Sequence, residues 1–144
     1  MNELVPIFFY GGLINLAVME RVGLVQREWR LASLPGYRIE IEPWVTLKPR
    51  PSSTSFGIVM PATHAELDAV YGRLAVRYYP FPILASTDQG FVPALSYFAG
   101  PMEKRIADAE HVMPLLRTAT RLGFPGWYLE EISSFLPREQ PDRT

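Results

Sequence analysis

Fourteen prolines are spread along these 144 residues, and they restrict the fold more than any other feature of the chain. Their share is about twice the usual value of roughly 5%. Because proline lacks a backbone N–H group and fixes its φ angle, it interrupts helices and central strands. The sequence therefore favours many turns and short elements over a helical bundle. The length fits one domain, and the composition predicts a mixed α+β fold.

The charged residues nearly cancel, since 14 lysines and arginines stand against 15 aspartates and glutamates. A chain without a positive surplus is poorly suited to a phosphate backbone, so we expect no nucleic-acid partner. Cysteine is absent, which excludes disulfides and is consistent with a cytoplasmic location. The uncharged run 4–19 is shorter than the roughly 20 residues of a membrane helix, so we expect no membrane span.

The start of the chain predicts a strand, a glycine loop and a helix. Residues 5–10 are apolar and aromatic, which is typical of a short buried strand, and Gly11 and Gly12 follow it. Asn15 is a suitable N-cap for the next helix, and Gly23 is a suitable stop. Such a loop can bind a small carboxylate through backbone N–H groups, although two glycines after a strand also form ordinary turns.

The next segments predict extended pieces. Residues 29–34 and 37–42 are expected to be strands on either side of a Pro35-Gly36 turn, because apolar and charged residues alternate in the second piece. Residues 49–55 are expected to form a Pro/Ser-rich connection, and residues 56–60 a buried strand.

A capping box marks the start of the next helix. Thr63 and Glu66 have the spacing at which each side chain binds the backbone of the other, so a helix is expected from His64. Its inward stripe is expected to contain Leu67, Val70, Tyr71 and Leu74. Tyr71 is therefore expected to point into the fold.

The remaining residues predict a hairpin and two helices. Strands are expected at 76–79 and 91–98, separated by Pro80, Pro82 and a turn at 86–90. A helix is expected from Pro101 to Gly123, with a kink at Pro114, and a shorter one from Pro125 with Trp127, Tyr128, Ile132 and Phe135 on its apolar side. The domain is expected to span residues 1–136, and residues 137–144 to form a disordered polar tail.

Several kinds of chemistry have no motif here. The two histidines, His64 and His111, are too far apart in sequence to form an HExxH site and are expected on the surface, so we expect no bound metal. The chain contains no GxGxxG or GxxxxGK phosphate loop and no GxSxG nucleophile elbow.

Four short segments, taken together, carry a resemblance. They are Tyr10-Gly11-Gly12-Leu13 after the first strand, Leu34-Pro35-Gly36-Tyr37-Arg38, Phe56-Gly57-Ile58-Val59, and Glu66-Leu67-Asp68. In this order they resemble the gamma-glutamylcyclotransferase-like (AIG2-like) superfamily over most of the chain. The resemblance implies a small mixed β-barrel or sheet with helices around it.

The resemblance also implies a reaction. Members hold a γ-glutamyl group over the Tyr10–Leu13 loop, and the substrate's own amine attacks its γ-carbonyl to give 5-oxoproline and a released amine or amino acid. Because both reacting groups belong to one molecule, the protein has only to fold the substrate and move a proton. No cofactor is implied, and the implied partner is a small molecule.

One position departs from the family pattern. The family's proton-moving glutamate stands in Leu-Asp-x-x-Glu-Gly, and the matching residues here are Leu67-Asp68-Ala69-Val70-Tyr71-Gly72. A tyrosine ordinarily has a pKa near 10, so at neutral pH it donates hydrogen bonds and is a poor base. Three interpretations stay open: Glu66 or Asp68 replaces the glutamate; Tyr71 or an acid from residues 77–88 moves the proton; or the pocket binds without turnover.

Two hypotheses follow. In the first, a pocket built by Tyr10, Gly11, Gly12, Leu13 and Tyr71 binds a γ-glutamyl or amino-acid-like ligand, with 5-oxoproline released through a non-standard proton carrier. In the second, the chain is a catalytically inactive interaction or scaffold protein. The aromatic segments 78–82 and 127–128 motivate the second hypothesis, and a homo-oligomer formed through them is a variant of it.

Overall fold

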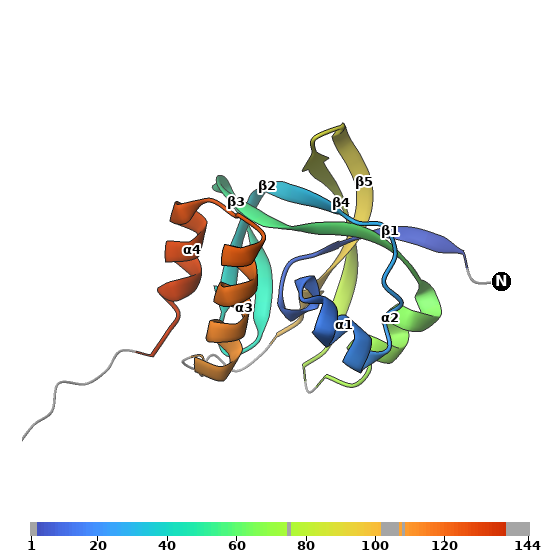
Figure 1. Ribbon diagram of the computed structural model, residues 1–144, viewed down its shortest axis with the longest axis horizontal. Helices are drawn as coiled ribbons and strands as arrows, with labels where there is room; N and C mark the ends of the chain where they lie inside the picture. The colour runs from blue at the N-terminus through green and yellow to red at the C-terminus, as the bar shows by residue number, and fades with distance from the viewer. Residues whose placement is uncertain (1–2, 75, 102–106, 108, 138–144) are drawn as a thin grey trace, which may run out of the picture.

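The computed structural model describes residues 3–74, 76–101, 107 and 109–137. Its elements are, in chain order, β1 (Leu4–Phe9), the short 3-10 turn η1 (Gly12–Ile14), α1 (Leu16–Val22), β2 (Arg30–Ile41), β3 (Val45–Thr63), α2 (His64–Tyr71), β4 (Tyr78–Thr87), β5 (Gly90–Ala99), α3 (Ala109–Arg121) and α4 (Gly126–Ser133). The strands form a closed barrel, with α1 and α2 on one side and α3 and α4 on another (Figure 1). The expected small mixed barrel with surrounding helices is confirmed.

The strand order around the barrel is β1, β3, β2, β4, β5. β3 is its longest strand, with 19 residues, and it pairs antiparallel with both β1 and β2. The barrel closes where β1 meets β5 in parallel, with Ile7 opposite Leu95. Because β1 lies between β3 and β5, its carboxyl end and the loop after it are held on both sides.

Two expected interruptions lie inside strands. Pro35 and Gly36 form an irregularity within β2, where the pairing register shifts before Tyr37 and Gly36 takes a φ of 87°. Residues 49–55 belong to β3, so the expected connection there is wrong. Local turn signals are overridden because β2 and β3 pair along nearly their whole lengths, which satisfies the backbone groups of both strands.

The expected hairpin is present as β4 and β5, but Pro80 and Pro82 lie within β4 and do not end its first strand. Proline is tolerated where a strand has no neighbour to receive its N–H group. β4 pairs with β2 only where Ser33 lies opposite Ser86. Along most of this edge, therefore, no partner strand requires a backbone N–H group from β4.

The helix ends agree with the local signals. The Asn15 carboxamide accepts hydrogen bonds from the N–H groups of Ala17 and Val18, at 2.9 and 3.4 Å, and Gly23 ends α1 with a φ of 86°. α2 begins with the complete capping box of Thr63 and Glu66.

The two C-terminal helices differ from expectation in part. α3 contains Pro114 and is described from Ala109; the expected start near Pro101 leads into residues 102–106, which lie outside the described residues. In α4, Tyr128 is buried as expected, whereas Trp127 points outward with 49% of its surface exposed. Residues 138–144 of the expected tail also lie outside the described residues.

The core fills the barrel and the space under the helices. Ile7, Phe8 and Phe9 of β1 are fully buried. Gly57 of β3 lies so close to β1 that a Cβ atom there would overlap the carbonyl oxygen of Phe9. Glycine is therefore required for the approach of these two strands. Within the described ranges, no helix is long and apolar enough to cross a membrane.

Candidate ligand cavity

A cavity of about 420 Å³ lies at the carboxyl end of β1. Its walls come from five parts of the chain: the loop after β1, helix α1, the turn between β2 and β3, the end of α2 with Tyr78, and one face of α3. The residues expected at the site all line it: Tyr10, Gly11, Gly12, Leu13 and Tyr71. The cavity is mainly apolar inside, and its rim carries exposed charged residues.

The loop after β1 forms the floor. Ile14 and Asn15 donate backbone hydrogen bonds to the carbonyls of Gly11 and Gly12, both at 3.1 Å, which makes the loop a 3-10 turn. A Cβ atom on Gly11 would lie 3.4 Å from the side chain of Val45. At Gly12 nothing lies within 4 Å of that position, so this glycine opens onto free space.

Tyr10 anchors the floor to the barrel. Its hydroxyl donates a hydrogen bond to the Tyr97 carbonyl at 2.5 Å. Burial, and then the neighbouring tyrosines, raise the pKa of Tyr10 well above its ordinary value. The phenol therefore stays protonated and serves as a fixed donor within the protein.

Tyr71 lies in a stack of aromatic rings. Its ring is parallel to that of Tyr97, with centroids 4.2 Å apart, and lies 5.4 Å from that of Tyr78. The Tyr78 hydroxyl is bound to the Val45 carbonyl at 2.5 Å, whereas the Tyr71 hydroxyl makes no such bond within the described part of the chain. Burial is the main reason why the pKa of Tyr71 is raised above its ordinary value. Tyr71 is therefore a donor and not a base.

The carboxylates next to Tyr71 in sequence do not line the cavity. Glu66 accepts hydrogen bonds from the backbone N–H groups of Val25 and Thr63 and forms an ion pair with Arg27 at 2.8 Å. Burial alone would raise its pKa, but these partners together outweigh that effect and lower the pKa of Glu66 to about 2. Asp68 lies on the exposed side of α2. Asp68 nevertheless acts on the aromatic stack, since burial and then the Asp68 charge raise the pKa of Tyr97, whose ring is stacked on that of Tyr71.

The acid in the 77–88 segment is also elsewhere. Asp88 lies at the tip of the β4–β5 hairpin, where its carboxylate is 3.7 Å from Arg30. From that segment only Tyr78 lines the cavity. The charged groups of the rim are Arg21, Arg73 and Glu110, and all three are exposed.

His111 is the residue that sequence reasoning missed. His64 is exposed as expected, but His111 is half-buried in the cavity wall, with its ring centroid 5.4 Å from that of Trp44. Its Nδ1 atom is buried and has no hydrogen-bond partner among the residues that the structure describes. No local signal could have identified it, because its aromatic neighbour comes from a distant part of the sequence. The described residues contain no cluster of three or more His, Asp or Glu that could hold a metal.

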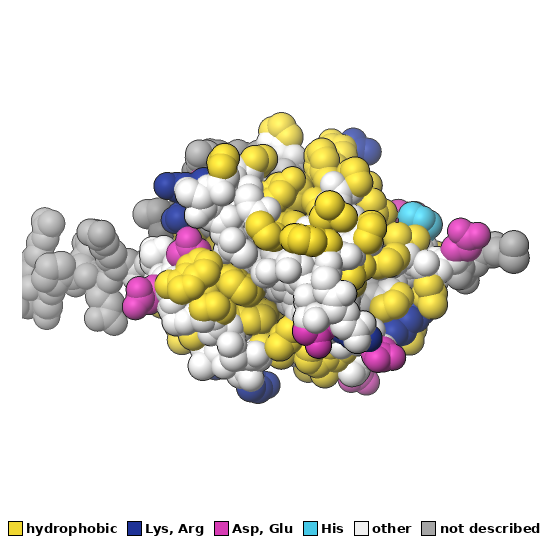
Figure 2. Space-filling view, turned by 90° about the horizontal axis from the view of Figure 1, so that it is seen from above, with side chains coloured by type: hydrophobic (Ala, Val, Ile, Leu, Met, Phe, Trp, Pro, Cys, Tyr) yellow, Lys and Arg dark blue, Asp and Glu magenta, His cyan; other side chains and the backbone are white. Residues whose placement is uncertain are grey.

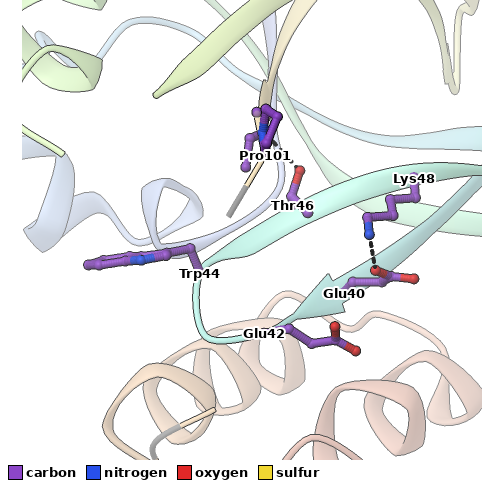
Figure 3. A pocket seen from close by; sticks show the side chains of 8 residues that line it. Glu40, Glu42, Trp44, Thr46, Lys48 and Pro101 are labelled. Atoms are coloured by element: carbon purple, nitrogen blue, oxygen red, sulfur yellow. Dashed lines mark hydrogen bonds and ion pairs between the residues drawn. The ribbon is translucent and has the colours of Figure 1, made fainter. Parts of the chain in front are cut away.

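A second cavity of about 310 Å³ lies against the β2–β3 hairpin (Figure 3). Glu40 and Lys48 point toward each other there and form an ion pair at 3.1 Å. Thr46 accepts a hydrogen bond from the Ala99 N–H group at 2.9 Å. Trp44 lines both cavities, so the charged pocket and the apolar one share this residue.

Comparison with known proteins identifies the fold. No protein-family model and no curated protein matches the sequence. A solved structure described as gamma-glutamyl cyclotransferase superposes with a TM-score of 0.77 over 98% of this chain and 93% of its own, at 16% identity. Uncharacterized protein loc79017 from Homo sapiens gives 0.75 with the same coverage and identity. YkqA from Bacillus subtilis gives 0.72 over 92% of this chain and 54% of its own, also at 16% identity.

Proposed function

We propose that this chain, which has the fold of gamma-glutamyl cyclotransferase, binds a γ-glutamyl or amino-acid-like ligand over the Tyr10–Leu13 loop and releases 5-oxoproline from it. The observation that carries the proposal is the meeting of five sequence-predicted residues around one cavity of about 420 Å³. Four of them lie in the loop after β1 and Tyr71 lies at the end of α2, so segments that are distant in sequence are brought together only by the fold.

The chemistry of the cavity suits a ligand with one charged end. Arg21 and Arg73 at the rim can pair with a carboxylate, because guanidinium groups bind carboxylates through charge-assisted hydrogen bonds. The free hydroxyl of Tyr71 can donate a further hydrogen bond. Apolar residues such as Val18, Leu74 and Leu115 can pack against the rest of the molecule.

The reaction needs little from the protein beyond this arrangement. Folding the substrate brings its own amine to its γ-carbonyl, so one molecule supplies both reactants. A group that moves a proton is still required, and the family's position for it holds Tyr71. The proposal therefore includes a proton carrier other than a glutamate on α2.

Mass spectrometry of purified protein tests the proposal. The protein is incubated with γ-glutamyl amines, γ-glutamyl amino acids and glutathione, and released 5-oxoproline is measured against a protein-free control. We expect release from at least one class, and its loss in Gly12→Leu. If nothing is released from any compound, the catalytic half fails; titration calorimetry with the same compounds then decides whether binding survives.

One observation favours a second candidate function, an interaction protein without turnover. Tyr79, Phe81, Leu84 and Phe91 of the β4–β5 hairpin are between 42% and 66% exposed. Figure 2, seen from the end at which this hairpin projects, shows hydrophobic side chains gathered on that face. Exposed apolar patches of this kind mark contact surfaces.

Light scattering tests the contact surface, because a second copy of the chain is the simplest partner. If the hairpin joins two copies, the wild type has the mass of a dimer, whereas Phe81→Ser and Phe91→Ser variants are monomers. A wild type that is monomeric at all concentrations excludes the homo-oligomer.

A further inference from the structure

The polar side chains of α3 that face the cavity have no role in the proposed function so far. Glu110, His111, Pro114, Leu115 and Thr118 all line the cavity from this helix. The helix packs directly on the end of the loop after β1, since the Asn15 carboxamide donates a hydrogen bond to Thr118 Oγ1 at 3.2 Å. A molecule that fills the cavity therefore meets this wall as well as the residues that the sequence predicted.

His111 is distinguished on this wall by an unpaired polar atom. Its Nδ1 is buried without a hydrogen-bond partner, and this condition is shared among the described side chains only by Glu131 Oε2. Buried polar atoms in proteins are nearly always paired, so an unpaired one at a cavity wall calls for an explanation, and a catalytic role is one of them. Because Nδ1 is enclosed, we assign the contact with a bound molecule to Nε2.

The other titratable groups of the cavity are less suited to carry a proton. They are Arg21, Arg73, Glu110, Tyr10, Tyr71 and Tyr78. Arginine keeps its proton at all ordinary pH values. The three tyrosines keep theirs because burial raises the pKa of each. Glu110 is exposed at the rim of the cavity, whereas His111 is half-buried and its ring packs next to that of Trp44. An imidazole is also the side chain best able to accept and return a proton near neutral pH.

We propose that His111 is the proton carrier of this cavity and takes over, from α3, the task that the family gives to a glutamate on α2. This inference rests on the proposed function. The neutral α-amine of the substrate attacks the γ-carbonyl carbon, and a new carbon–nitrogen bond forms. His111 takes one proton from the attacking nitrogen. The bond between the γ-carbon and the departing nitrogen then breaks, that nitrogen keeps the electron pair, and His111 returns the proton to it. The products are 5-oxoproline and a free amine, and the imidazole is neutral again.

The chain offers a matched control, because it has only two histidines and His64 is exposed at the start of α2, away from the cavity. Release of 5-oxoproline is measured for the wild type, His111→Gln, His64→Gln and Glu110→Gln. General acid–base groups contribute about 10²–10⁴-fold to rates. We expect kcat/KM to fall about 100-fold or more in His111→Gln and to stay within about two-fold in His64→Gln. Thermal melts identify any variant that fails to fold.

A rescue experiment separates proton transfer from a packing role. His111→Ala leaves space beside Trp44, and added imidazole is expected to restore release in this variant in proportion to its concentration. A merely structural role gives no such recovery. A second readout needs no turnover: addition of 5-oxoproline is expected to shift the imidazole NMR signals of His111 and not those of His64.

The outcomes are distinct for the two proposals. If the wild type releases 5-oxoproline and His111→Gln does so equally well, His111 is not the carrier and the proposed function stands. If Glu110→Gln alone loses activity, the carrier is the neighbouring carboxylate and the assignment to His111 is wrong. If the wild type releases nothing from any compound, both the catalytic function and the carrier role are overturned.

Discussion

The rings of Tyr71 and Tyr97 lie parallel, with centroids 4.2 Å apart and planes inclined by 6°. The backbone carbonyl of the same Tyr97 accepts the hydrogen bond of Tyr10. Tyr97 therefore connects the loop after β1 with the end of α2, and it keeps the two halves of the candidate site at a fixed separation.

Replacement of Tyr71 by Phe removes the hydroxyl group and keeps the aromatic ring, so the contributions of the two can be measured separately. The aromatic ring remains on Tyr97, so we expect the free energy of unfolding to change by less than about 0.5 kcal/mol. Loss of one hydrogen bond to a ligand weakens binding by about 1 kcal/mol, or roughly five- to ten-fold. Calorimetry with a γ-glutamyl ligand measures this loss. Tyr79→Phe is the control, because that tyrosine is exposed and does not line the cavity. If Tyr71→Phe binds the ligand as tightly as the wild type does, the Tyr71 hydroxyl does not contact the ligand.

Gly12→Leu is expected to block the cavity without disturbing the fold. Nothing lies within 4 Å of a Cβ atom at this position, so a larger side chain extends into the cavity. We expect at least a ten-fold loss of affinity and a nearly unchanged melting temperature. Gly126→Leu is the matched control, since its Cβ position is equally free and lies away from the cavity. A Gly12→Leu variant that binds as well as Gly126→Leu contradicts the placement of the ligand over the loop.

Gly57→Ala is expected to destabilise the barrel. The added methyl group would overlap the Phe9 carbonyl oxygen and lie 3.0 Å from Phe8 Cζ, so β1 and β3 must move apart. Overpacking of a core of this kind costs about 3 kcal/mol of unfolding free energy. Urea denaturation measures the change, with Gly126→Ala as a control that is expected to cost almost nothing. Unchanged stability would show that the two strands can separate freely at this point.

Glu66 is expected to make stability depend on pH in the acid range. Its carboxyl pKa is about 2 in the folded chain and about 4.3 in an unfolded one. Because the folded value is the lower, the stabilisation is complete above about pH 5 and is lost as the pH falls toward 2. The side chain is 13% exposed, so after allowance for solvent screening the effect is about 2 kcal/mol.

Unfolding free energies at pH 7, 4.5 and 2.5 test this dependence. The wild type should exceed Glu66→Gln clearly at pH 7, and the difference should shrink at pH 2.5. Glu130→Gln, at an exposed position of α4, is expected to follow the wild type throughout. A constant difference between wild type and Glu66→Gln would mean that the ion pair with Arg27 contributes nothing.

Signals confined to a few neighbouring residues predicted their structures well. Asn15, Gly23 and the Thr63–Glu66 pair mark helix ends through contacts with their own surroundings, and each does so in the structure. The loop and Tyr71 line one cavity, as their order along the chain led us to expect, and their roles in binding and catalysis stay predictions.

Features that depend on distant partners were not predictable in this way. Pro35 and Gly36 are typical of a turn, but the pairing of β2 with β3 keeps the strand continuous through them. His111 has the sequence surroundings of an ordinary helix residue. Its ring becomes part of a cavity wall only because Trp44, 67 positions earlier in the chain, folds against it.

The barrel closes along the line where β1 meets β5, here called the seam. The candidate site therefore depends on contacts between segments that are far apart along the chain. Ser96 binds the Phe8 carbonyl and Tyr10 binds the Tyr97 carbonyl, across 88 and 87 positions of sequence. Joining such distant segments carries a large loss of chain entropy, which local hairpins such as β4–β5 do not incur. The loop that forms the cavity floor is attached to this seam. A chain in which every hairpin has formed, but in which β1 and β5 have not yet met to close the ring of strands, therefore has no complete site. Ligand recognition and ring closure are thus thermodynamically linked, and an occupied cavity favours the closed ring over every open state.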